Sequence, residues 1–152
     1  MGNLGCGCSG SMAKVIEREE TENNITGVKA QSELRQWPVQ LHLVPPTAPY
    51  FQDADILICA DCVAFAMGSM HQDLLKNKAL AIACPKLDDT TAYVDKLSHI
   101  FSVNNIKSIT VAIMEVPCCR GLDIMVQEAL AKSGKEIPLE RVVIGINGER
   151  RN

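Results

Sequence analysis

The sequence lacks a long uncharged apolar run, a P-loop and a large excess of charge. Its least polar stretch, residues 54–68, is interrupted by Asp55 and Asp61 and is shorter than the roughly 20 residues of a membrane-spanning helix. Fifteen Lys and Arg residues against 18 Asp and Glu residues give a net charge of −3, which predicts no basic surface for nucleic acid. The spacing G-x-G-x-x-G occurs at residues 5–10, but it does not follow a predicted strand, and no P-loop occurs, so no nucleotide cofactor is indicated. We therefore expect no membrane and no nucleic-acid partner.

The chain also lacks a charged segment followed by an apolar one at its start, which is the pattern of a secretory signal. We therefore expect a cytoplasmic protein. Its seven cysteines among 152 residues are then expected to be reduced thiols or metal ligands, since a disulfide framework belongs to oxidising compartments. A chain of this length buries enough surface to fold without disulfides, which leaves the cysteines free for chemistry.

Four short apolar runs alternate with segments of helical periodicity. The runs are residues 55–60, 79–83, 108–114 and 141–146, and they are nearly continuous in apolar residues, as strands buried on both faces are. The apolar positions of the three helical segments are Val63, Met67, Met70 and Leu74, then Tyr93, Leu97, Ile100 and Phe101, then Leu122, Met125, Val126, Ala129 and Leu130. Residues 39–44 alternate in polarity and are expected to form a further strand at a sheet edge.

This alternation predicts a three-layer α/β fold, Rossmann-like or flavodoxin-like, with a mainly parallel sheet of four to five strands. We expect residues 31–152 to form a single α/β domain and residues 1–30 to be a Gly/Ser-rich and charged N-terminal segment. Asp88 and Asp89 are expected to cap the second helix, and Gly134 to end the third in a left-handed turn.

The cysteines follow the predicted strands. Cys62 comes two residues after the first run, Cys84 directly after the second, and Cys118 and Cys119 shortly after the third. The carboxyl ends of parallel strands lie at one edge of the sheet, where open α/β folds bind their ligands. We therefore expect these thiols at one site. Cys59 lies inside the first run and is as well explained by core packing as by ligation.

A fourth ligand is available in the glycine-rich start of the chain, where Cys8 follows Cys6. Four thiolates suit zinc or an iron–sulfur cluster and exclude hard cations such as magnesium. The candidates are 22 and 34 residues apart, unlike the tight C-x2-4-C pairs of structural zinc sites. We predict an iron–sulfur cluster, [4Fe-4S] in type, bound by Cys8, Cys62, Cys84 and either Cys118 or Cys119, with a ligand role for both of the last two left open.

Five segments of the chain resemble a known family. They are SELRQWPVQLHLVPPTAPYF (32–51), ADCVAFA (60–66), CPKLDD (84–89), MEVPCCRGL (114–122) and VIGING (143–148). In order and content they resemble the C-terminal domain of ferredoxin-type, iron–sulfur cluster-binding (4Fe-4S) proteins of anaerobic microbes. In that family the domain commonly follows a module with two C-x2-C-x2-C-x3-C runs. No such run occurs here, so the resemblance implies the domain in its stand-alone form, without the clusters of that module.

The family's C-P-G-S motif corresponds to Cys8-Ser9-Gly10-Ser11, which keeps the thiol and changes one position. The resulting hypothesis is a redox protein that transfers electrons, or a small oxidoreductase, whose partner is a ferredoxin-like protein or an oxidoreductase subunit. Two alternatives stay open at this stage. One is a metal-free thiol-disulfide or persulfide enzyme using Cys118 and Cys119, or Cys59 and Cys62, with a thiol pKa lowered by a helix start. The other is a zinc-stabilised binding module. Both a monomer and a homodimer are compatible with the sequence.

Overall fold

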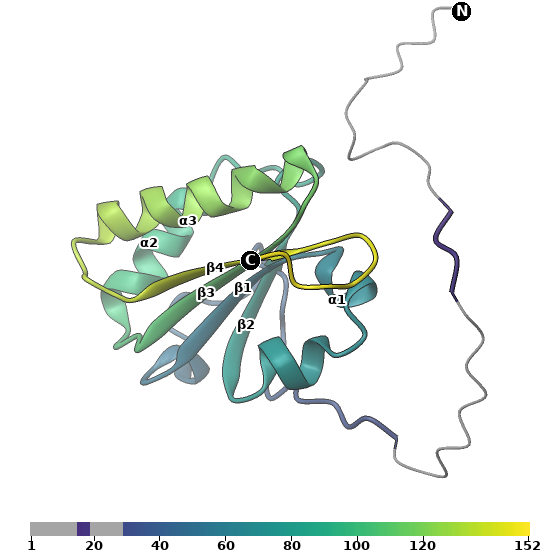
Figure 1. Cartoon of the computed structure of the whole chain (residues 1–152). Coiled ribbons are helices and arrows are strands. Elements are labelled where there is room, and N and C mark those ends of the chain that lie inside the picture. The colour runs from purple at the N-terminus through teal and green to yellow at the C-terminus, as the bar shows by residue number, and fades with distance from the viewer. Residues whose placement is uncertain (1–14, 19–28) are drawn as a thin grey trace, which may run out of the picture.

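The computed structural model of the chain describes residues 15–18 and 29–152, and it consists of one parallel sheet with helices on its two faces (Figure 1). The strands are β1 (Asp55–Ala60), β2 (Lys78–Ala83), β3 (Ser108–Met114) and β4 (Leu139–Ile144). Their order in the sheet is β2-β1-β3-β4, and every neighbouring pair is parallel. The prediction of a parallel α/β sheet is confirmed.

The two central strands are buried because helices cover both of their faces. Ile56 to Ala60 in β1 and Ile109 to Met114 in β3 are all buried, which explains their nearly continuous apolar sequence. The boundaries predicted for β1 and β3 agree with the structure, whereas β4 begins and ends two residues earlier than expected.

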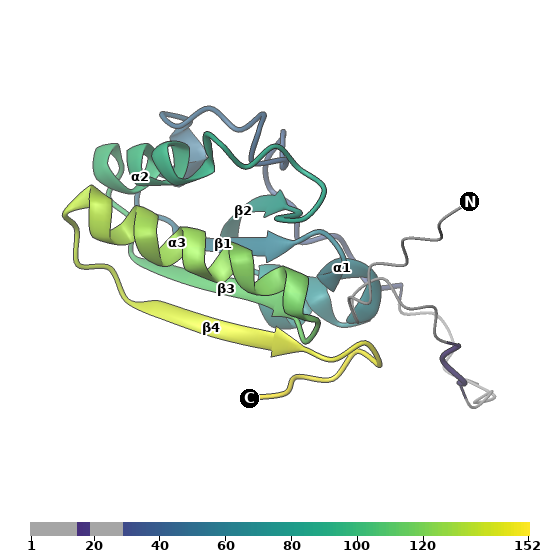
Figure 2. The same cartoon turned by 90° about the horizontal axis from the view of Figure 1, so that it is seen from above.

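Two long helices, α2 (Tyr93–Val103) and α3 (Arg120–Ser133), lie side by side on one face of the sheet, as Figures 1 and 2 both show. The short helix α1 (Val63–Ala66) and the π-helical segment η3 (His71–Leu75) follow β1, and Figure 1 shows η3 on the opposite face from α2 and α3. Short 3-10 turns, η2 (Pro49–Phe51) and η4 (Pro117–Cys119), precede β1 and α3. Helix α3 ends at Gly134, whose φ of +70° confirms the expected left-handed cap.

The first predicted helix is interrupted. Met67, at the end of α1, has an extended backbone (φ −101°, ψ 104°), so the helical segment continues only after a turn. The predicted apolar positions are still buried, with Val63, Met67, Met70 and Leu74 between 0% and 6% exposed. The helical period therefore identified the buried side chains correctly and missed the break between them.

The strand predicted over residues 39–44 is wrong. Gln40 makes a single parallel bridge to Ile82 at the edge of β2, and the chain then turns, because the N–H groups of Leu43 and Val44 both donate to the Gln40 carbonyl. Leu41 and Val44 are fully buried and Leu43 is 64% exposed, a spacing of three that fits a turn and not an alternating strand.

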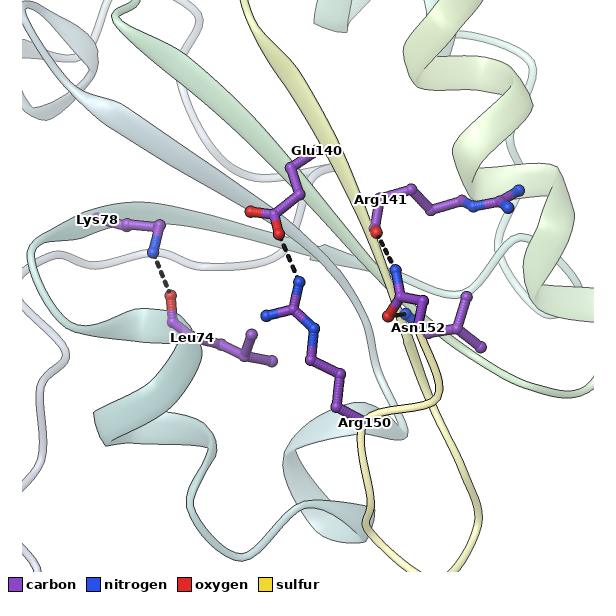
Figure 3. A network of polar contacts seen from close by, with 7 residues as sticks. Leu74, Lys78, Glu140, Arg141, Arg150 and Asn152 are labelled. Atoms are coloured by element: carbon purple, nitrogen blue, oxygen red, sulfur yellow. Dashed lines mark hydrogen bonds and ion pairs between the residues drawn. The ribbon is translucent and has the colours of Figure 1, made fainter.

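Both edges of the sheet are closed by a side-chain amide. On the β2 edge, Gln36 donates to the Leu80 carbonyl and accepts from the Leu80 N–H, each at 2.7 Å. On the β4 edge, Asn152 donates to the Arg141 carbonyl at 2.6 Å and accepts from the Val143 N–H at 3.2 Å, a contact seen in Figure 3. Such amides occupy backbone groups that would otherwise pair with another chain.

Within the described part of the chain, every helix is too short or too polar to cross a bilayer.

Candidate functional site

The loops that carry the predicted ligands start from three neighbouring strands. Cys84 follows β2, Cys62 follows β1, and Cys118 and Cys119 form the end of η4 after β3, and these strands are adjacent in the order β2-β1-β3. All three loops therefore leave the same edge of the sheet. Cys8 lies outside the described residues, so its place at this edge stays a prediction.

The edge also contains the point where the strand order reverses. From β1 the chain moves outward to β2, and from β2 it crosses back past β1 to β3. The loops after β1 and β3 consequently diverge to opposite faces, and ligands of open parallel α/β sheets bind in the crevice at such a point. Cys62 and Cys118 come from the two loops that flank it.

The thiols are close enough to influence one another electrostatically. Burial raises the pKa of Cys62, and the charges of Cys84, Asp61 and Cys118 raise it further. Cys62 is exposed, whereas Cys84 and Cys118 are half-buried. One exposed thiol therefore lies within electrostatic range of thiols from the two other loops.

Cys119 and Cys59 lie deeper. Burial raises the pKa of Cys119 to about 11, and the charges of Cys118 and Cys62 act in the same direction. Burial raises the pKa of Cys59 to about 12, and this residue is 1% exposed within β1. Cys59 thus belongs to the core, and Cys119 is buried next to the half-buried Cys118.

The expected activation of a thiol by a helix start is not present. Cys62 precedes α1, but this helix has only four residues and the pKa of Cys62 is raised, not lowered. A thiol with a raised pKa is mostly protonated near neutral pH and is a poor nucleophile. This geometry weighs against a Cys59–Cys62 redox pair.

Asp88 organises the Cys84 loop. One of its carboxylate oxygens accepts the Cys84 N–H at 3.0 Å and the Tyr93 hydroxyl at 2.5 Å, and Tyr93 is fully buried. The expectation that Asp88 and Asp89 cap α2 is wrong, since the residue at the cap position is Ala92 and Asp89 bonds to Thr91. Asp88 instead fixes the backbone at the cysteine, because the loop turns back on itself over four residues.

Asp61 is an unsatisfied acid beside Cys62. Its N–H donates to the Ala83 carbonyl at 3.1 Å, but its buried Oδ1 has no hydrogen-bond partner among the described residues. Burial raises the pKa of the Asp61 carboxyl, and the charge of Asp88 adds to the effect. An unpaired carboxylate oxygen next to thiols is costly for stability and is a common feature of functional sites.

Close packing holds the loops against one another. A Cβ on Gly121, at the start of α3, would lie 3.2 Å from the Pro85 side chain, so the loops after β2 and β3 are in contact. Gly148 has a φ of +98°, and a Cβ there would lie 2.4 Å from the Ala66 carbonyl, so the segment after β4 packs on α1. Two large apolar side chains on these loops are exposed to solvent: Phe65 is 93% exposed and Leu87 is 84% exposed.

The arrangement does not form a compact single-ion site. Among residues 15–18 and 29–152, no three His, Cys, Asp or Glu side chains are grouped closely enough to hold one metal ion. The loops supply only soft sulfur ligands as candidates, which are the thiols of Cys62, Cys84 and Cys118 and the more buried thiol of Cys119. A cluster several ångströms across accepts more widely spaced thiolates than a single zinc ion does.

The hydrophobic pattern gives no indication of the Asp88–Tyr93 pair. A carboxylate four residues after Cys84 is the one local signal, and at the level of sequence it is more simply explained as a helix cap. The tyrosine is likewise explained by its core position alone.

Comparison with known proteins agrees with the fold. A family described as "Rossmann-like domain" matches residues 48–151. An uncharacterized protein of Archaeoglobus fulgidus is 34% identical over 116 residues, which cover 76% of this chain and 81% of that relative. No solved structure gives a significant match. The parallel sheet, the strand order and this family match lead to one conclusion: the chain belongs to the Rossmann-like domain family.

Proposed function

We propose that this protein is an iron–sulfur redox protein whose cluster is bound by Cys62, Cys84 and Cys118. The observation that carries the proposal is the position of these thiols, which follow three adjacent parallel strands. Burial raises the pKa of Cys62, and the charges of Cys84 and Cys118 add to that effect. Independent loops converge on one edge, so their shared residue type is not a consequence of sequence proximity. The resemblance of five segments to iron–sulfur proteins of anaerobic microbes supports the same chemistry.

The fourth ligand is Cys8 or Cys119 in this proposal. Cys119 is 6% exposed and follows Cys118 directly in the chain. Cys8 belongs to the glycine-rich start of the chain, outside the described residues, and is the fourth ligand that the sequence predicts. When bound, a [4Fe-4S] cluster exchanges one electron at a time with a partner.

The protein's own residues set the environment of the cluster. Asp88 accepts a hydrogen bond from the Tyr93 hydroxyl and another from the Cys84 N–H, and it thereby holds the Cys84 backbone in place. Polar contacts to ligand residues tune reduction potentials. Cys62 is exposed, and the apolar side chains of Phe65 and Leu87 are exposed on the loops after β1 and β2, which leaves the site accessible to a protein partner. We propose a ferredoxin-like protein or an oxidoreductase subunit as that partner, in a cytoplasmic setting.

The test is metal and sulfide analysis of protein purified without oxygen. We expect iron and acid-labile sulfide in equal amounts and a visible absorption that bleaches with dithionite. Cys62→Ala, Cys84→Ala and Cys118→Ala should each lose most of the iron. Cys59→Ala is the matched control, because Cys59 is buried three residues before Cys62, and it should keep the iron.

Retention of iron and sulfide by all three ligand variants would overturn the proposal. Zinc without sulfide in the wild-type protein would also overturn it and would indicate a structural zinc module. The variants Cys8→Ala and Cys119→Ala identify the fourth ligand, since only the one that provides it should change the spectrum.

A further inference from the structure

A small pocket lies beside the thiol edge, between strand β4 and the start of helix α3. Its volume is about 200 Å³, below the roughly 300–1,000 Å³ of sites for drug-sized molecules. Ile113 and Val143, which are paired in the sheet, contribute apolar surface. The charged lining consists of Arg120, Arg141, Arg151 and Glu115. Three guanidinium groups therefore line this pocket together with one carboxylate.

The three arginines come from three separate elements. Arg120 is the first residue of α3, and Arg141 lies on β4. Arg151 belongs to the C-terminal segment, where its backbone N–H donates to the Val143 carbonyl at 2.8 Å. Figure 3 shows the Arg141 side chain extending toward the helix, away from Arg150. Their meeting at one pocket is thus a product of the fold.

Two of the arginines are held in place by carboxylates, of which only Glu115 lines the pocket. Asp123, whose side chain is 8% exposed, lies 3.6 Å from Arg141. Glu149 lies 2.9 Å from Nε of Arg151, and Glu115 lies 3.1 Å from the same atom. These carboxylates fix the side chains and reduce the entropy that a ligand would have to remove.

Arg120 differs from the other two. Within the described residues it makes no ion pair and no side-chain hydrogen bond, so all of its donors are available. The backbone N–H of Arg120 already donates to the Pro117 carbonyl, so the guanidinium is the group through which this residue can bind a ligand. This unpaired guanidinium, at the positive end of a 14-residue helix, favours a negative charge in the pocket.

We propose that this pocket binds a small anion, the carboxylate or phosphate group of a small organic molecule, with Arg120 and Arg141 as its main partners. Arg–carboxylate and Arg–phosphate pairs form charge-assisted, often bidentate hydrogen bonds, and the apolar surface of Ile113 and Val143 accommodates a short carbon chain.

The pocket is joined to the candidate cluster site by the chain itself. Glu115 and Arg120 flank the segment that carries Cys118 and Cys119, so a bound anion lies next to the thiol edge. A role for this anion as the substrate of a redox reaction rests on the proposed function, whereas binding itself does not.

The test is titration of the full-length, metal-free protein with sodium phosphate and, separately, with sodium succinate. Binding is followed by the side-chain Nε–H signals of the arginines in NMR spectra, at an ionic strength held constant with sodium chloride. We expect saturable shifts with at least one of the two probes. The probe that binds more tightly identifies the group as phosphate or carboxylate.

Arg120→Gln is the decisive variant, because this side chain makes no hydrogen bond or ion pair within the described residues whose loss would affect folding. We expect at least about tenfold weaker binding, the effect of losing one charged hydrogen-bond partner. Arg150→Gln is the matched control, since Arg150 pairs with Glu140 away from the pocket (Figure 3), and it should bind as the wild type does.

Three results would overturn the proposal: no saturable shift with either probe, unchanged affinity in Arg120→Gln, or equal weakening in Arg150→Gln. Because the protein is metal-free in this experiment, none of these three results depends on the iron–sulfur proposal. Anion binding by the metal-free protein would likewise neither support nor contradict the iron–sulfur proposal, which has its own test.

Discussion

The two ends of the sheet treat their polar groups in opposite ways. At the amino ends of the strands, the Ser108 hydroxyl donates to Asp55 at 2.6 Å, and the Asn105 side chain donates to Asp53 at 2.6 Å. At the carboxyl ends, Asp61 has a buried oxygen with no partner among the described residues, and burial together with the charges of Cys84, Asp61 and Cys118 raises the pKa of Cys62. One end is arranged for stability, and the other keeps unsatisfied groups that a ligand can satisfy.

The comparison separates stabilising groups from unsatisfied ones. The buried strands, the polar pairs at the amino end and the Asp88 contacts at the carboxyl end stabilise the sheet. Asp61 reduces stability, because an unpaired buried acid costs free energy. Selection for a site, more than for folding, accounts for such a group.

The largest expected contrast is between two cysteines three residues apart. In the metal-free protein at mildly alkaline pH, we expect iodoacetamide to modify Cys62 at least about a hundredfold faster than Cys59, because the thiolate is the reactive form and Cys59 is buried with a pKa of about 12. A time course of peptide mass spectra measures both rates. Similar rates would show that the carboxyl end is not open as described.

The next largest effect concerns the Asp88 contact. Asp88→Ala leaves the buried Tyr93 hydroxyl and the Cys84 N–H without their partner, which should lower the free energy of unfolding by about 1–3 kcal/mol. Urea denaturation of the metal-free protein measures this. Asp89→Ala is the control at the neighbouring position, where only the exposed Thr91 contacts are lost, and a loss as large as that of Asp88→Ala would contradict the assignment.

At the amino end, Asp55→Ala should lower the free energy of unfolding by about 0.5–1.5 kcal/mol, since the Ser108 hydroxyl is only partly buried and can turn to water. The iron content of the anaerobically purified protein should not change. A loss of iron in this variant would mean that the two ends are coupled, contrary to the comparison.

The smallest effect is expected for Asp61→Asn. No hydrogen bond of the buried Oδ1 is lost, and the repulsion between Asp61 and Asp88 is removed, so the metal-free protein should gain up to about 1 kcal/mol of stability. Urea denaturation beside the wild type measures the change. A clear destabilisation would show that the carboxylate has a structural partner after all.

Much of the fold follows from periodicity. The apolar runs of β1 and β3 and the buried positions of α2 could be predicted because continuous burial and a spacing of three to four are direct consequences of the layered architecture. The turn at Leu41 to Val44 could not, since alternation over a few residues also arises when a chain turns with both ends buried. The break at Met67 depends on tertiary packing and has no proline or paired glycine to indicate it.

The site was predictable in part. The place of Cys62, Cys84 and Cys118 after successive strands is visible in the sequence, because parallel strands present their carboxyl ends together. The acid that fixes Cys84 and the arginines that meet beside β4 were not visible. The positions of these side chains depend on how the loops fold back on the sheet. Arg151 and Glu115, for example, form an ion pair although they are 36 residues apart in the sequence, and no local spacing predicts such a contact.

The most direct test of the central claim is native mass spectrometry of the full-length protein, purified and sprayed without oxygen. We predict a mass above that of the chain by four iron and four sulfide atoms, and the mass of the bare chain in Cys84→Ala. A wild-type protein that has only the mass of the chain, even after incubation with iron and sulfide under reducing conditions, would contradict the account.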